Sequence, residues 1–301
     1  MRYMVLVKGN AKSEAGILPD ETMLSEMGRF NQEMLAAGVM LAGEGLKATA
    51  HGFRVRGTAK KVSVLDGPFT EAKEVIAGFW IIKVASRAEA IDWIKRVPHI
   101  EGEIELRLLY EPSDFPVDAS ETAGGWRENE EAYRQQAADA QQAAAPTPRL
   151  PGTTRYLVAL HGDRATESGA LPTPQALEQM GGLMTEVAES GVLLGADGLK
   201  PSASGARIRF DGAKRTVIDG PFAETKELIA GYCIIQVKTR QEAQDFARRW
   251  LEIHHRTSRV PLDETLLEVR PLFELEDFPV TTAEKADGWR RQQQAARDRP
   301  R

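Results

Sequence analysis

Two hydrophobic periodicities alternate along the chain, and they predict strands and helices in a regular order. Residues 3–8, YMVLVK, form a short apolar run that is typical of a strand. From Asp20 to Leu35 the apolar positions recur every three or four residues, which predicts an amphipathic helix capped by Asp20 and ended by Gly38. Residues 39–46 then predict a second strand.

The next elements are a hairpin, a buried strand and a second helix. Residues 53–56 and 61–65 alternate polar and apolar positions across a short turn, which predicts a hairpin. The near-continuous apolar run at 77–84 is typical of a strand buried on both faces. Ser86 is placed to cap a helix, and residues 104–110 form the last strand. The order β-α-β-β-α-β with an added hairpin predicts a ferredoxin-like α+β sheet with both helices on one face.

The same order of elements occurs twice. The sequence DGPF stands at Asp66–Phe69 and again at Asp219–Phe222, 153 residues later, with matching flanks. The sequence DFPV stands at 114–117 and at 277–280, an offset of 163 residues. Ten additional residues therefore lie between the two motifs of the second copy, around 251–260. We predict two copies of one module.

The repeat divides the chain into four segments. The first module covers residues 1–117 and the second covers 154–280. Residues 118–153 form a polar, Ala- and Gln-rich stretch followed by prolines, which predicts a helical arm and a linker. Residues 281–301 predict a C-terminal arm. At 301 residues the chain is too long for one ordinary core, which agrees with two domains.

Composition and charge narrow the class of protein. A formal net charge of −5 argues against nucleic-acid binding, which needs a basic surface. The apolar stretch at 3–7 is too short for a signal-peptide core or a membrane span, so we expect a cytoplasmic protein that does not enter a membrane. The single cysteine, Cys233, excludes an internal disulfide, and we predict that it is a core residue of a strand.

No sequence motif for a metal or a cofactor stands out. The chain contains no GxGxxG after a strand, no P-loop, no GxSxG and no CxxC, so we expect no cofactor and no serine hydrolysis. The adjacent histidines His254 and His255 have no HxxxH spacing and no cysteine nearby, so we expect no metal site there. We predict a surface loop for this pair.

The DGPF motif is followed by T/A-E-x-K-E and an apolar strand, behind an N-terminal RYMVLVKG-like strand, and this arrangement resembles the YCII-related family, specifically its DGPF subgroup. The resemblance covers residues 1–117 and 154–280. It implies ferredoxin-like modules that pair sheet to sheet as a dimeric α/β barrel. Because a linker of about 30 residues holds the partner at about millimolar effective concentration, the resemblance implies an intrachain pseudo-dimer, with a further homodimer optional.

The resemblance also bears on activity and partners. The wider family is associated with a His–Asp pair that carries out acid–base chemistry. None of the five histidines here has a histidine at the matching position of the other copy, so no general-base histidine is carried over. Family members often occur beside extracytoplasmic-function sigma factors, which implies a regulatory setting and a protein partner of that kind.

Asp66 and Asp219 are the candidate catalytic residues. In one interpretation each aspartate accepts a hydrogen bond from a nearby backbone N–H, such as that of Phe69, and the motif is only a turn. In the other, the carboxylate ends a strand inside a cleft between the modules, near Glu71, and acts as an acid, a base or a substrate anchor. Both interpretations stay open.

Polar residues that recur in both copies form the candidate ligand-binding set. Arg54 and Arg56 lie two residues apart in a strand, so their side chains project to one face. That face is either a solvated outer surface, with Phe53 and Val55 inward, or it lines a groove between the modules and binds a small carboxylate or phosphate. The candidate ligand-binding residues are Lys47, Arg54, Arg56, Glu71, Lys73, Lys200, Arg207, Arg209, Glu224 and Lys226.

Two functions follow as hypotheses. The first is a module that binds a small polar or anionic molecule in the cleft between its halves, with weak acid–base enzyme activity as an added hypothesis. The alternative is a protein-interaction or regulatory module that holds another protein, such as a sigma-factor-type regulator, with its arms or a sheet face. The sequence identifies neither the ligand nor the partner.

Overall fold

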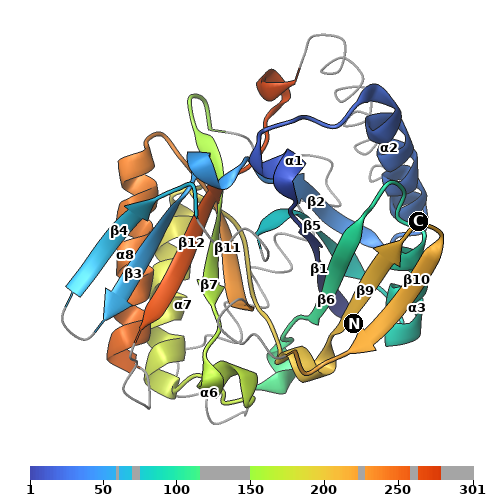
Figure 1. Cartoon of the computed structure of the whole chain (residues 1–301). Coiled ribbons are helices and arrows are strands. Elements are labelled where there is room, and N and C mark those ends of the chain that lie inside the picture. The colour runs from blue at the N-terminus through green and yellow to red at the C-terminus, as the bar shows by residue number, and fades with distance from the viewer. Residues whose placement is uncertain (59–60, 70–74, 116–149, 223–227, 258–263, 279–301) are drawn as a thin grey trace.

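The protein has an α+β fold in which two six-stranded antiparallel sheets face each other and carry helices on their outer faces (Figure 1). We call the part up to residue 115 the first half and the part from residue 150 the second half. Of the arm and linker predicted at 118–153, residues 118–149 lie outside the described residues, as does the whole arm predicted at 281–301. The computed structural model describes residues 1–58, 61–69, 75–115, 150–222, 228–257 and 264–278.

The first sheet has the strand order β10-β9-β6-β1-β5-β2. Its central strand β1 pairs with β5 on one side and with β6 on the other. Its strands are β1 (Arg2–Lys8), β2 (Met40–Gly45), β5 (Ile76–Lys83), β6 (Gly102–Leu108), β9 (Ala206–Asp211) and β10 (Lys214–Asp219).

The second sheet has the matching order β4-β3-β12-β7-β11-β8. Here β7 is central and pairs with β11 and β12. The strands are β3 (Phe53–Thr58), β4 (Lys61–Asp66), β7 (Thr154–His161), β8 (Leu193–Gly198), β11 (Ile229–Val237) and β12 (Thr265–Pro271).

Each half donates its hairpin to the sheet of the other half. The β3–β4 hairpin of the first half pairs with β12, and the β9–β10 hairpin of the second half pairs with β6. Figure 1 shows the light-blue hairpin beside the orange-red β12, and the orange hairpin beside the green β6. The sequence predicted both hairpins but treated each as a decoration of its own module. The intrachain pseudo-dimer is therefore joined by continuous backbone hydrogen bonding in both sheets.

Two helices from each half cover the outer faces of the sheets. In the first half these are α2 (Glu21–Ala36) and α3 (Arg87–Lys95), and in the second half α7 (Pro174–Glu189) and α8 (Arg240–Thr257). The predicted caps are confirmed in the first half, because Asp20 accepts from the Met23 N–H at 2.8 Å and Ser86 accepts from the Glu89 N–H at 3.2 Å.

Side chains of β1 point alternately to the two faces of the first sheet, so they contribute to two separate apolar cores. Tyr3 and Val5 of β1 face the helices, whereas Met4 and Leu6 face the opposite sheet. Met4 and Leu6 belong to an apolar layer that includes Leu157 and other residues of the second half. Apolar burial of this kind is the main force that holds two sheets face to face.

Residues 251–257 of the insertion predicted around 251–260 lie in a helix, which corrects the loop predicted for His254 and His255. Both histidines lie in α8, which is twice as long as α3. Burial lowers the pKa of His254, and the ring of His255 lies 3.3 Å from the Thr265 hydroxyl. Cys233 is buried in strand β11, as predicted.

Among the helices of the described ranges, none has the length and apolar character that crossing a membrane requires. A cytoplasmic location stays a prediction.

Candidate functional site

The inner face of each sheet changes from apolar to charged where the exchanged hairpin joins it. On β6, Ile104 and Leu106 face the helices, so the alternating residues Glu105 and Arg107 point between the sheets. Glu105 is 1% exposed and Arg107 is fully buried. Buried charges need partners, because burial without them is strongly unfavourable. The partners come from both halves.

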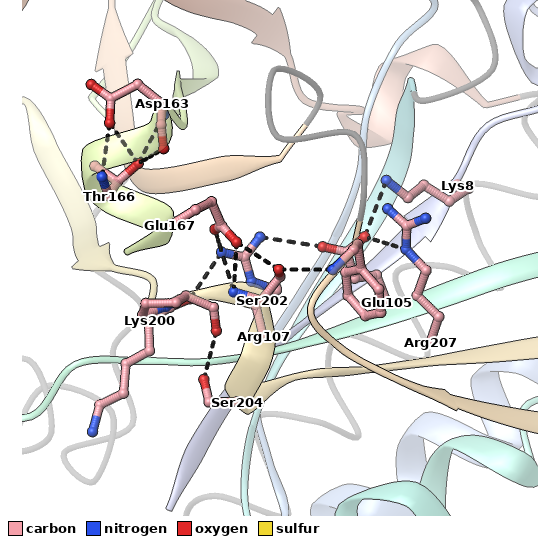
Figure 2. A network of polar contacts seen from close by, with 12 residues as sticks. Lys8, Glu105, Arg107, Asp163, Thr166, Glu167, Lys200, Ser202, Ser204 and Arg207 are labelled. Atoms are coloured by element: carbon pink, nitrogen blue, oxygen red, sulfur yellow. Dashed lines mark hydrogen bonds and ion pairs between the residues drawn. The ribbon is translucent and has the colours of Figure 1, made fainter. Parts of the chain in front are cut away.

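The first group, which we call the Glu105 cluster, is drawn in Figure 2. The carboxylate of Glu105 accepts from Arg207 Nε at 2.9 Å and from Arg107 Nη1 at 3.3 Å, and the Lys8 ammonium lies 3.5 Å away. Arg207 lies directly opposite Glu105 across the exchanged strand pair. The cluster consists of Lys8, Glu105 and Arg107 from the first half and Glu167, Ser202 and Arg207 from the second.

A short helix positions Glu167 in the Glu105 cluster. Asp163 caps the one-turn helix α6 (Arg164–Glu167), where the sequence predicted no helix. Glu167 at its end accepts from Arg107 Nη2 at 3.1 Å and from the Ser202 hydroxyl at 2.5 Å. Arg107 Nη2 also donates to the Lys200 carbonyl at 2.8 Å, whereas its Nε has no hydrogen-bond partner among the described residues.

The electrostatics of Glu105 follow from these contacts. Burial by itself raises the pKa of a carboxyl group, but Lys8, Arg107 and Arg207 together outweigh it and hold the pKa of Glu105 below its ordinary value. Glu105 is therefore a buried carboxylate that stays ionised at neutral pH.

A second group, the Glu268 cluster, repeats the arrangement in the other sheet. Glu268 Oε2 accepts from Arg54 Nε at 3.0 Å and Nη2 at 2.8 Å, and Oε1 accepts from Arg270 Nη1 at 3.1 Å. His161 Nε2 lies 3.7 Å from Glu268. The cluster consists of Glu14, Thr49 and Arg54 from the first half and His161, Glu268 and Arg270 from the second.

The Glu268 carboxylate is likewise kept ionised. Burial opposes its charge, but His161, Arg270 and Arg54 hold the pKa of Glu268 well below its ordinary value. Glu14, at the end of the short helix α1 (Ala11–Glu14), accepts from the hydroxyl of Thr49, as Glu167 does from Ser202.

The DGPF turns support these clusters from outside. The Phe69 N–H donates to the Thr49 hydroxyl at 3.3 Å, which corrects the prediction that the aspartate would accept it. The Arg54 guanidinium stacks 4.1 Å from the Phe69 ring centre. A Cβ on Gly67 would lie 1.9 Å from the Thr49 carbonyl oxygen, so the close approach of two backbones requires glycine here. The turn thus holds the arginine and the hydroxyl of its cluster in place.

Asp66 and Asp219 lie outside both clusters. Their side chains are each 74% exposed, and each forms an ion pair with the residue that begins a helix of the opposite half, Arg240 of α8 for Asp66 and Arg87 of α3 for Asp219. These contacts support the structural interpretation of the motif, in the form of a link between the halves. Their catalytic role stays a prediction.

The other sequence-predicted ligand residues divide into four groups. Arg54 and Arg207 lie in the clusters. Arg56 and Arg209 are exposed and form ion pairs with Glu264 and Glu103, respectively.

The side chains of Lys47 and Lys200 bind Asp277 and Asp114 across the halves, and only their carbonyl oxygens reach the clusters. Glu71, Lys73, Glu224 and Lys226 lie outside the described residues.

Sequence reasoning missed all four acidic members of the clusters, which are Glu14, Glu105, Glu167 and Glu268. Glu105 and Glu268 were detectable, since each precedes a matched arginine by two residues in an otherwise apolar strand. His161 escaped because the comparison of copies kept only identical residue types, and its counterpart is Lys8. No group of three or more metal-binding side chains occurs in the described parts of the chain.

Fold and clusters together define a tandem α+β protein in which each half completes the sheet and the polar cluster of the other. The sequence model of the YCII-related domain matches residues 1–112 and 154–251, more than half of the chain. The chain therefore belongs to the YCII-related family and contains its domain twice. The second match ends inside α8, where the inserted residues begin.

Two further similarities were found. An uncharacterized protein of Rhizobium meliloti (strain 1021) is 30% identical over 102 residues, covering 32% of this chain and 82% of that protein. A solved structure of a mutant chlorite dismutase from Candidatus Nitrospira defluvii has a TM-score of 0.38 and 7% sequence identity, covering 96% of this chain and 94% of that one.

Proposed function

We propose that this protein binds a small anion, a carboxylate or a phosphate, at the junction between its halves, against the guanidinium groups of the two clusters. The observation that carries the proposal is the convergence of basic side chains from both halves on a single buried carboxylate, Glu105. Groups that keep one buried carboxylate ionised also favour a second anion nearby, because guanidinium groups bind carboxylate and phosphate oxygens in matching geometry.

The exchange of hairpins supports a site at the junction. Arg54 and Arg207 enter the opposite sheet on the donated strands β3 and β9. Each then lies across from a glutamate of the receiving half. The protein-interaction alternative stays a prediction, because no feature of the described residues favours a particular partner.

The test is calorimetric titration of the full chain with malonate and, separately, with inorganic phosphate. The variant Arg54→Gln with Arg207→Gln removes one guanidinium from each cluster, and we expect it to weaken binding by about tenfold or more, the factor that corresponds to about 1.4 kcal/mol. The matched control, Arg56→Gln with Arg209→Gln, changes the exposed arginines two positions further along the same strands and should bind like the wild type.

The two probes distinguish the two kinds of anion. Binding of malonate alone would identify a carboxylate site, and binding of phosphate alone would identify a phosphate site. A folded wild-type protein that binds neither at about 10 mM, a concentration above the range of most specific ligands, would refute the proposal. Equal losses of binding affinity in the Arg54→Gln, Arg207→Gln variant and in the Arg56→Gln, Arg209→Gln variant would also refute it.

A further inference from the structure

The two clusters differ at one of their charged positions. Lys8 lies 3.5 Å from Glu105, whereas its counterpart in the second half, His161, lies 3.7 Å from Glu268. A lysine ammonium keeps its charge across the physiological range, but an imidazole is the side chain whose charge changes between pH 5 and 8. The Glu105 cluster thus has an ammonium group where the Glu268 cluster has an imidazole.

The clusters also differ in the hydrogen bonds of their buried arginines, Arg270 and Arg107. Arg270 donates both its Nε, at 3.0 Å, and its Nη2 to the Lys47 carbonyl, and its Nη1 to Glu268. In the Glu105 cluster only Nη2 of Arg107 reaches the matching carbonyl, and Nε has no acceptor among the residues that the structure describes. Arg107 is fully buried, and buried N–H groups almost always have an acceptor. Arg107 therefore keeps a donor for an additional oxygen atom.

In the Glu268 cluster the arginines are matched by an equal number of carboxylates. Arg54 from β3 and Arg270 from β12 both pair with Glu268, Arg270 also pairs with Glu14 from α1, and His161 contacts Glu268. Two guanidinium groups thus face two carboxylates, and the Arg270 donors are taken up within the cluster. Nothing in this arrangement selects an additional anion.

We infer that the two halves have diverged, so that the chain binds one anion, in the Glu105 cluster, with Lys8 and the Nε of Arg107 as the groups that select it. This inference rests on the proposed function and adds the site and the stoichiometry. The ligand class is a small carboxylate or phosphate, because guanidinium and ammonium groups both bind such oxygen atoms.

The test is titration of the full chain with malonate and with inorganic phosphate at pH 8. We expect one equivalent of one of these probes per chain. Lys8→Met should weaken its binding by about tenfold or more, the usual range for losing one charged partner, and Lys8→Arg should restore most of it. His161→Met, the matched change in the other half, should leave one equivalent bound with an affinity within about twofold of the wild type.

Folding is checked by thermal unfolding of each variant, and Lys8→Gln serves as a second charge-removing variant if Lys8→Met unfolds. Two equivalents in the wild type, with one lost in each of Lys8→Met and His161→Met, would overturn the inference and leave the proposed function standing. Loss of binding in His161→Met but not in Lys8→Met would also overturn it. No binding of either probe to the wild type would instead refute the proposed function itself.

Discussion

Replacing Glu268 by glutamine tests whether the buried clusters hold the halves together. Glu268 has a side chain that is 9% exposed, and it accepts hydrogen bonds from Arg54 and Arg270 at 2.8–3.1 Å. The amide keeps the shape but removes the negative charge that Arg54 and Arg270 share, and Arg270 keeps only the Glu14 carboxylate, 3.7 Å away. Breaking a buried pair in this way destabilises a protein by about 3–5 kcal/mol. We expect a loss of that size in urea unfolding at pH 7.

Glu264→Gln is the matched control. Glu264 precedes the same strand and binds the other arginine of β3, Arg56, but its side chain is 38% exposed and that of Arg56 is 56% exposed. Exposed pairs contribute about 0–1 kcal/mol, so the control should lose little. Similar losses in both variants, or less than about 1 kcal/mol for Glu268→Gln, would show that the cluster does not stabilise the junction.

The stability difference between the wild type and Glu268→Gln should also depend on pH, which gives a second check. The pKa of Glu268 is lowered on folding, so its stabilising contribution is fully present above the unfolded-state value of about 4.3 and is lost as the pH falls through the lower native value. The stability difference between the wild type and Glu268→Gln should therefore be largest near neutral pH and shrink below about pH 4. A stability difference that grows as the pH falls would contradict a lowered pKa for Glu268.

Three further predictions follow from the junction. Gly67→Ala places a Cβ 1.9 Å from the Thr49 carbonyl and should cost about 1–3 kcal/mol in urea unfolding, whereas Gly182→Ala, in an open helical position, should stabilise by about 0.5–1 kcal/mol. Asp66→Asn with Asp219→Asn removes two exposed ion pairs and should change the free energy of unfolding by about 0–1 kcal/mol per pair. The two halves produced separately should not persist as monomers and should recombine when mixed, as size-exclusion chromatography would show.

The periodicity of the sequence was sufficient to predict the elements. The helix from Asp20 and the strand at 77–84 appear within one or two residues of their predicted bounds, because apolar spacing depends on local geometry alone. One-turn helices such as α1 and α6 escaped, since four residues are too few to show a helical period. Their polar caps, Asn10 and Asp163, are the only local signal that marks them.

The exchange of hairpins was not predictable from the same pattern. Phe53 and Val55 must be buried on one face of β3 whether that strand pairs with its own half or with the other. Both pairings therefore require the same alternation of apolar and polar residues along β3, and the sequence pattern does not distinguish them. The residues on the neighbouring strand distinguish the two pairings. In the observed pairing Arg54 lies opposite Glu268, and a charged residue of one sign directly across from the other sign is favourable.

The exchange of hairpins couples the association of the halves to the assembly of the clusters. Each cluster takes half of its members from each half of the chain, so separating the halves dismantles both clusters at once. A ligand that binds only the assembled state stabilises it by mass action, by about 2.7 kcal/mol at a hundredfold excess over its dissociation constant. An anion bound beside Glu105 would therefore strengthen the pairing of the halves, whose contacts in turn form its site. Fusing two modules into one chain then keeps this site assembled at any protein concentration, which a dimer of separate modules does not achieve.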